Sequence, residues 1–170
     1  MNLDQKILRA RAKEVSGHKI KQDALAESLL VVEFLLIPER YGIESKYVSE
    51  VLSLQEMTPI PGTPAFVAGV MNVRGKIVSI LNLKLLFNLK ERGITKLNKI
   101  ILVRMHQMEF GIVTDDIAGT LKVYPNTLSA PPANLHGINA EYIQGITPEG
   151  IILLDGANLL TNKTIIVNQK

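Results

Sequence analysis

The sequence predicts a mainly β protein made of two similar, strongly curled sheets, and three observations support this prediction. From Leu29 onward, short apolar runs alternate with Gly, Pro, Asn and Asp, which is typical of short strands joined by tight turns. Two short motifs recur in the same order later in the chain. Each copy contains about five short strands, a number suited to a small barrel that leaves few open strand edges.

Composition excludes several classes of protein. The 170 residues are enough for one domain or two small ones. The chain has no cysteine, which excludes a disulfide scaffold, a thiolate zinc site, an iron–sulfur cluster and a cysteine nucleophile. The formal net charge of +3 is too small to indicate nucleic-acid binding by itself.

The chain is expected to be cytoplasmic, with no direct insertion into a membrane. Asp4 and Lys6 stand where a secretion signal would have its apolar segment. The longest apolar stretch, Leu29–Ile37, contains Glu33 and is far shorter than the roughly 20 residues that cross a bilayer.

Residues 1–28 are predicted to form a helical extension. Apolar residues recur there at helical spacing between charged ones, namely at Leu3, Ile7, Leu8, Ala12 and Val15. Asp4 is a candidate N-cap and Gly17 a candidate stop. This pattern fits a helix packed on the domain and also fits a helix that docks on a partner.

The remaining elements follow from the same patterns in chain order. Strands are expected at Leu29–Ile37, Tyr41–Glu44, Phe66–Val73, Ile77–Leu81, Lys99–Met105, Phe110–Thr114, Thr120–Tyr124, Tyr142–Thr147 and Ile151–Leu154. Val48–Leu52 fits either a strand or a single helical turn. Short helices are expected at Leu83–Glu91 and Gly156–Thr161. Two proline-containing stretches, 59–64 and 125–132, are predicted loops, because proline cannot donate to a sheet ladder.

An internal repeat divides the chain. Tyr41-Gly42-Ile43 corresponds to Phe110-Gly111-Ile112, each after an apolar strand and a tight turn. Further on, Phe66-Val67-Ala68-Gly69-Val70 corresponds to Tyr142-Ile143-Gln144-Gly145-Ile146. The approximate halves are 29–91 and 97–167, within one domain over 29–167. Two curled units packed together are expected to leave a groove suited to binding.

No motif predicts catalysis, a metal or a cofactor. The three histidines, His18, His106 and His136, are far apart and lack the spacing of metal ligands. Asp115 and Asp116 are neighbours on a predicted strand, so their carboxylates are expected on opposite faces. The segment from Gly69 to Lys76 lacks the spacing of a phosphate-binding loop. We expect a protein that is not an enzyme.

Binding of single-stranded nucleic acid is the alternative function, because small barrels bind single strands with aromatic platforms and basic grooves. Aromatic residues make up only 5% of the chain, and there is no tryptophan. The four aromatics at repeat positions are interpreted as core residues: Tyr41, Phe66, Phe110 and Tyr142. We therefore expect no nucleic-acid partner.

The most informative segment is 63–83, which reads Thr-Pro-Ala-Phe-Val-Ala-Gly-Val-Met-Asn-Val-Arg-Gly-Lys-Ile-Val-Ser-Ile-Leu-Asn-Leu. Asn72-Val73-Arg74-Gly75 is predicted to be a hairpin turn, since Asn and Gly accept positive φ. Gly69 indicates a bulge or a close backbone approach. Arg74 would then be held at a rigid tip, either as a donor to a partner or in a pair with a local carboxylate.

Segment 63–83 closely resembles the long central motif of CheW-type chemotaxis coupling proteins. Tyr41-Gly42-Ile43, Val48-x-Glu50-Val51, Phe110-Gly111-Ile112-Val113 and the Tyr142-x-x-Gly145 hairpin extend the resemblance over about residues 29–162. It implies two pseudo-symmetric, five-stranded SH3-like β-barrels, in agreement with the repeat. Ser79 and Asn82 depart from the family pattern, in which proline and aspartate are usual, so position 82 carries no charge here.

The resemblance implies an adaptor that couples the cytoplasmic tips of methyl-accepting chemoreceptors to the regulatory domain of the histidine kinase CheA, without catalysis. A paralogue in a non-flagellar pathway is an open alternative. The implied partner-binding residues are Val48, Glu50, Val51, Gly69, Asn72, Arg74 and Gly75. Two binding surfaces on one rigid body would make the encounter of receptor and kinase effectively intramolecular.

Overall fold

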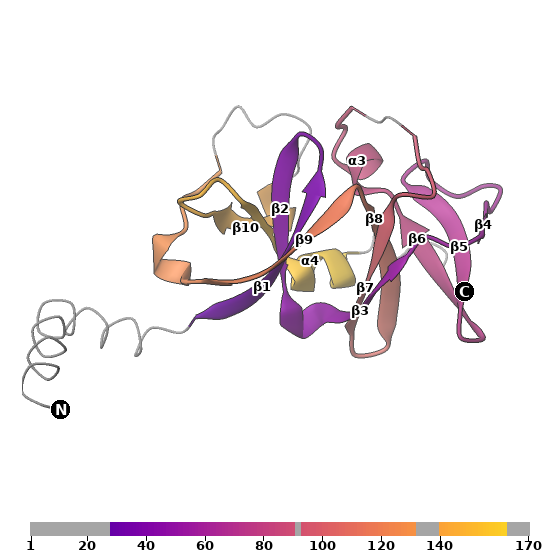
Figure 1. Ribbon diagram of the computed structural model, residues 1–170, viewed down its shortest axis with the longest axis horizontal. Coiled ribbons are helices and arrows are strands. Elements are labelled where there is room, and N and C mark those ends of the chain that lie inside the picture. Colours follow the sequence, from indigo (N-terminus) through magenta and orange to yellow (C-terminus); the bar gives the residue numbers. More distant parts are fainter. Residues whose placement is uncertain (1–27, 91–92, 132–139, 163–170) are drawn as a thin grey trace, which may run out of the picture.

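The computed structural model of the protein describes residues 28–90, 93–131 and 140–162, which form two β-sheets side by side (Figure 1). The predicted helical extension lies outside these ranges except for its last residue, as do His18 and His136. The mainly β prediction is confirmed. No helix in the described ranges is long and apolar enough to cross a membrane.

Sheet A has five strands in the order β10-β11-β2-β1-β9. They are β1 (Leu29–Leu36), β2 (Glu39–Glu44), β9 (Asp116–Val123), β10 (Ile143–Ile146) and β11 (Ile152–Leu154). Beyond β9, Ser129 forms an antiparallel bridge with Ile146, with N–O distances of 2.9 Å in both directions. This bridge connects the two ends of the sheet, so sheet A closes into a small barrel.

Sheet B has six strands in the order β3-β7-β8-β6-β5-β4. They are β3 (Val48–Ser53), β4 (Met57–Thr58), β5 (Val67–Val73), β6 (Lys76–Leu81), β7 (Lys99–Met105) and β8 (Met108–Thr114). The two end strands, β3 and β4, belong to one short segment that bends between Ser53 and Met57. The continuous segment β3–β4 therefore joins the two ends of sheet B. If β3 and β4 are counted as one bent strand, sheet B is a five-stranded barrel.

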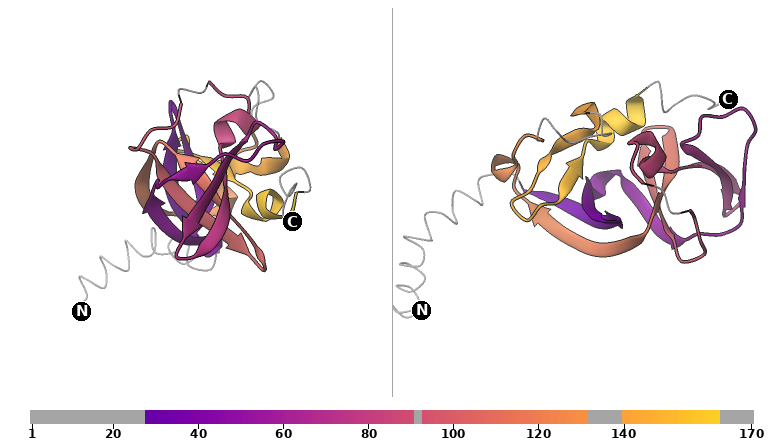
Figure 2. Two further views of the ribbon diagram at one scale, coloured as in Figure 1. Left: turned by 90° about the vertical axis from the view of Figure 1, so that its right-hand side faces the viewer. Right: turned by 90° about the horizontal axis from the view of Figure 1, so that it is seen from above.

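The two repeats exchange strands. The hairpin β1–β2 pairs with β9 and β11, whereas the equivalent hairpin β7–β8 pairs with β3 and β6. The predicted halves 29–91 and 97–167 therefore do not coincide with the two sheets. Each hairpin completes the sheet of the other repeat. The hairpin β1–β2 joins β9, β10 and β11, and the hairpin β7–β8 joins β3, β4, β5 and β6 (Figure 2).

Equivalent glycine contacts recur on the two sheets. Gly42 of β2 pairs with Leu153, and Gly111 of β8 pairs with Ile80, both in parallel register. A Cβ at Gly42 would lie 2.6 Å from Val31 Cγ1, and one at Gly111 would lie 2.7 Å from Ile80 Cδ1. Close packing of neighbouring side chains over the backbone thus requires glycine at both positions.

Each repeat ends in a short capped helix. Asn82 Oδ1 accepts the Lys84 N–H at 3.0 Å at the start of α3 (Leu83–Leu86), and Asp155 Oδ1 accepts the Asn158 N–H at 3.0 Å at the start of α4 (Gly156–Thr161). Asn82 therefore caps α3 as Asp155 caps α4, but without a charge.

Several predicted element bounds need correction, and the alternative left open at Val48–Leu52 is decided. The helix expected over Leu83–Glu91 ends at Leu86, and Asn88 has a φ of +57°, which stops further helical turns. Tyr142 belongs to the 3₁₀ helix η3 (Ala140–Tyr142), so the strand begins one residue later. The segment at Val48 is a strand, preceded by the 3₁₀ helix η1 (Ser45–Tyr47). Finally, β9 begins at Asp116 rather than Thr120, and the 3₁₀ helix η2 (Pro125–Thr127) follows it.

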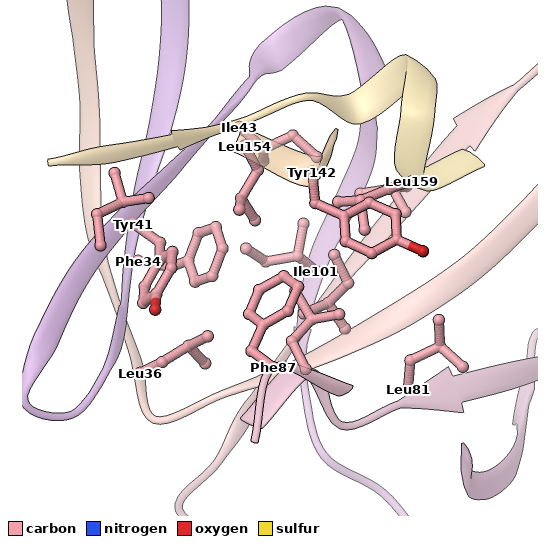
Figure 3. Packing of buried hydrophobic residues seen from close by; sticks show 14 of the residues in the cluster. Phe34, Leu36, Tyr41, Ile43, Leu81, Phe87, Ile101, Tyr142, Leu154 and Leu159 are labelled. Atoms are coloured by element: carbon pink, nitrogen blue, oxygen red, sulfur yellow. The ribbon is translucent and has the colours of Figure 1, made fainter. Parts of the chain in front are cut away.

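The largest buried cluster fills the contact between the sheets. It combines residues of both sheets with the residues after α3 and in α4 (Figure 3). Phe34, Tyr41, Phe87 and Tyr142 form a continuous series of rings, with successive centroids 6.0, 6.3 and 6.0 Å apart. Where the sheets meet, the expected groove is thus occupied by side chains of the core.

Tyr41 carries a polar atom that this core does not satisfy. The side chain is fully buried, and its hydroxyl has no hydrogen-bond partner among the described residues. Burial raises the pKa of the Tyr41 hydroxyl above its usual range, so the group stays protonated at neutral pH. The equivalent residue in the other repeat is Phe110, which has no hydroxyl.

Replacing Tyr41 by phenylalanine is expected to leave stability unchanged or to raise it by about 1 kcal/mol, because it removes an unsatisfied buried donor and keeps the ring. Urea unfolding of the two proteins measures this. A loss of more than about 1 kcal/mol would show that the hydroxyl has a partner.

A cluster of polar side chains lies where the chain crosses from β8 to β9, in the upper part of Figure 1. Asp115 Oδ2 lies 2.7 Å from Lys84 Nζ of α3 and accepts the Ile37 N–H of the β1–β2 turn at 2.7 Å. Its Oδ1 accepts from Asn98 Nδ2 at 3.4 Å. The Lys84 side chain is only 5% exposed. Asp115 therefore joins both sheets and α3 through one carboxylate.

Candidate partner-binding site

The turn between β5 and β6 holds Arg74 as the sequence predicts. Arg74 and Gly75 have φ angles of +52° and +85°, and Asn72 Oδ1 accepts the Gly75 N–H at 2.7 Å. Positive φ therefore falls on Arg74 and Gly75 rather than on Asn72, and Asn72 stabilises the turn through its side-chain acceptor. This turn lies at the lower end of sheet B in Figure 1.

Arg74 pairs with Glu50, another of the predicted site residues. Arg74 Nη1 donates to Glu50 Oε1 at 2.6 Å, and Nη2 donates to Glu50 Oε2. This bidentate geometry suits a guanidinium and a carboxylate and fixes their relative orientation. It links the tip of the β5–β6 hairpin to β3, although the two residues are 24 positions apart.

The pair is accessible to a partner. The Arg74 side chain is 73% exposed and that of Glu50 is 29% exposed. Hydrogen bonding and charge from Arg74 lower the pKa of the Glu50 carboxyl, and Glu50 raises the pKa of the Arg74 guanidinium. Because the pKa of Glu50 is lowered, the ion pair persists below the usual range of glutamate and is lost only on further acidification.

Beside this pair lies a shallow pocket of about 230 Å³, formed entirely by sheet B. We call it the rim pocket; it is lined by Ser49, Glu50, Val73, Arg74, Lys76, Val78, Leu102, Arg104 and Glu109. Lys76 Nζ donates to Glu109 Oε1 at 2.7 Å, and Ser49 Oγ lies 3.3 Å from Glu109 Oε2. Sequence analysis did not single out Lys76, Arg104 or Glu109, because their proximity depends on the pairing of β6, β7 and β8.

The other predicted residues do not share this surface. Val48 packs against the core between the sheets. Val51 is 42% exposed but pairs with Ile101, whereas Glu50 pairs with Leu102, so the two point to opposite faces of β3. Gly69 is buried in a bulge of β5 against the backbone of Thr58. The structure thus brings together Glu50 and Arg74 of the predicted set, with Asn72 and Gly75 in the turn.

Sequence analysis also missed an exposed apolar side chain beside Asn72. Ile77 pairs with Asn72 across the β5–β6 hairpin and is 61% exposed. Together with Val70 and Thr58 it lines a second pocket, on the outer face of sheet B. The signal was present in the sequence, since Ile77 and Val78 are adjacent apolar residues and only one of them can face the interior of a barrel.

The described residues contain no group of three or more His, Cys, Asp or Glu that could hold a metal ion. The two neighbouring aspartates also have separate surroundings. Asp115 binds Lys84, whereas Asp116 Oδ1 accepts the Ile117 N–H at 2.9 Å.

The family model of the CheW-like domain matches residues 30–164. The chain belongs to the CheW-like family. It is 34% identical to the chemotaxis protein CheW of Treponema pallidum, over 82% of this chain and 86% of that protein. It is 28% identical to the chemotaxis protein CheW of Klebsiella aerogenes, over 85% and 88% of the two chains.

A solved CheW-like structure agrees with the fold. The scaffolding protein TtCheW from Thermoanaerobacter tengcongensis superposes with a TM-score of 0.68 and 30% identity, over 76% of this chain and 85% of that one. Together with the family match, these likenesses support a CheW-type chemotaxis coupling adaptor.

Proposed function

We propose that this CheW-like chain is a cytoplasmic adaptor that links the tip of a chemoreceptor to the regulatory domain of the histidine kinase CheA and performs no reaction itself. The observation that carries the proposal is the accessible Glu50–Arg74 pair at the end of sheet B, whose two residues belong to two of the segments that give the family resemblance. A fixed, exposed guanidinium orients a partner, and exposed apolar residues nearby supply buried contact area.

The described surface offers two faces for two partners. The rim pocket is polar and contains the Glu50–Arg74 pair, whereas the outer face of sheet B presents Ile77. Both belong to one sheet that packs firmly on the other through the large core cluster. Holding two partners on one rigid body raises their effective concentration for each other.

Nucleic-acid binding has less support than the adaptor function. Tyr41, Phe110 and Tyr142 are buried, and Phe66 is half-buried against the core, as the sequence predicted. These rings are therefore not available as a stacking platform for bases.

Replacing Arg74 by alanine is expected to weaken binding of a receptor-tip fragment at least tenfold, because the oriented charge is lost at the exposed pair. The fold is expected to remain intact, since solvent screens an exposed ion pair and leaves it little weight in stability. Isothermal titration of the purified protein with the fragment measures the change in Kd.

The matched control is Arg40→Ala. Arg40 also donates to a glutamate, from Nε to Glu33 Oε2 at 2.7 Å, but it lies on sheet A. We expect its Kd to equal that of the unaltered protein. Equal Kd values for both variants and the unaltered protein would contradict the assignment of Arg74. Failure of the unaltered protein to bind both the receptor fragment and the kinase regulatory domain would contradict the proposed function itself.

A further inference from the structure

The charges around the rim pocket do not balance. Its lining contains the carboxylates Glu50 and Glu109 and the cations Arg74, Lys76 and Arg104. Both oxygens of Glu50 accept from Arg74. The oxygens of Glu109 are occupied by Lys76 Nζ and Ser49 Oγ. Both carboxylates of the pocket are therefore already engaged.

Arg104 is left without an ion pair or side-chain hydrogen bond among the described residues. It stands directly opposite Glu109 in the β7–β8 register, yet Glu109 is turned to Lys76 and Ser49. The side chain is exposed, so its charge is solvated rather than buried. The pocket therefore carries one uncompensated positive charge with all the donors of a guanidinium free.

We propose that Arg104 is the uncommitted cation of the partner-binding surface and receives an Asp or Glu side chain of the partner protein in the rim pocket. This inference rests on the proposed adaptor function and names the chemistry by which one of its partners is recognised. Arg74 already holds Glu50 in a bidentate pair, so a partner carboxylate that approached Arg74 would compete with an internal one. At Arg104 an incoming carboxylate displaces only water, and it gains a geometry that suits bidentate binding.

The shape of the pocket agrees with this assignment. Its open volume of about 230 Å³ adjoins the apolar side chains of Val73, Val78 and Leu102. A side chain with an aliphatic stem and a terminal carboxylate, such as glutamate, fits a lining that combines apolar walls with a cationic rim. Lys76 and Arg74 add to the positive potential at the entrance, which steers an anionic segment toward the pocket.

The test compares Arg104→Glu with Lys122→Glu, which makes the same charge change on an exposed residue of β9 in sheet A. Each full-length protein is titrated with the receptor-tip fragment and with the kinase regulatory domain, at low and at moderate salt. For one of these partners, we expect Arg104→Glu to raise Kd at least tenfold and to flatten its salt dependence. Lys122→Glu is expected to change Kd less than twofold, and both variants to unfold at the same temperature as the unaltered protein.

Three outcomes would overturn the inference. If the unaltered protein binds and both variants bind alike, Arg104 has no role, whereas the adaptor function stands. If the unaltered protein binds neither partner, the proposed function fails and the inference fails with it. If Arg104→Glu instead abolishes binding of a random single-stranded oligonucleotide and leaves both protein partners unaffected, the pocket receives phosphate rather than a protein carboxylate.

Discussion

Replacing Asp115 by alanine is expected to lower the free energy of unfolding by about 3–5 kcal/mol, the largest effect we anticipate for a single substitution in this protein. The loss has two sources. Lys84 Nζ would remain almost fully buried without its counter-charge, and the Ile37 N–H would lose its acceptor. Because these groups belong to α3 and to the β1–β2 turn, both sheets lose an anchor at the point where the chain crosses between them.

Urea unfolding with a linear extrapolation measures the change, and Asp116→Ala is the matched control. The Asp116 side chain is exposed and, among the residues that the structure describes, accepts only the neighbouring Ile117 N–H, so its loss is expected to cost less than about 1 kcal/mol. The explanation fails if the two alanine variants unfold at the same urea concentration. Lys84→Met in the Asp115→Ala background should recover part of the loss, because it removes the unpaired buried charge.

Gly69→Ala is expected to lower the free energy of unfolding by about 3 kcal/mol, from a backbone clash and an unfavourable φ together. A Cβ at this position would lie 2.5 Å from the carbonyl oxygen of Thr58, where the φ of Gly69 is +154°. Backbone cannot move aside as the end of a flexible side chain can. The pairing of β4 with β5, which closes sheet B, is therefore expected to weaken first.

Gly75→Ala separates the two causes. The φ of Gly75 is +85°, but nothing lies within 4 Å of the position of an added Cβ. We expect a loss of about 1 kcal/mol there, from conformation alone. Thermal unfolding of both variants, followed by circular dichroism, gives the comparison. A Gly69→Ala variant as stable as Gly75→Ala would contradict this explanation, because it would show that β4 moves away from position 69 without cost.

Much of the fold could be predicted because it depends on local sequence patterns. Short apolar runs and turn residues indicated the strands, and the recurrence of Tyr41-Gly42-Ile43 as Phe110-Gly111-Ile112 indicated the repeat. The exchange of hairpins between the sheets could not be predicted in the same way. The exchange depends on long-range pairings, namely β1 with β9, β2 with β11, β3 with β7 and β6 with β8, and local sequence patterns carry no information about them.

The candidate site was predicted in part. Asn72, Arg74 and Gly75 lie in one turn, so local preferences were enough to place them. Arg104 and Glu109 come from other strands, and only the register of sheet B brings them to the same pocket.

The sequence pattern did not indicate that Lys84 is buried, because a lysine within a predicted short helix is usually exposed. Its burial depends on Asp115, which the sequence pattern placed on a strand rather than at a crossing between sheets.

The exchange of hairpins also affects how the chain folds while it is being synthesised. β1 leaves the ribosome first, yet one of its two neighbours in the finished sheet is β9, synthesised much later, and β2 waits for β11. Until then, the apolar face of that hairpin lacks its final cover, and closing so long a loop is slow. The first strands therefore reach their final pairing only after the last strands have been made. A truncated nascent chain would expose an unpaired strand edge that promotes aggregation.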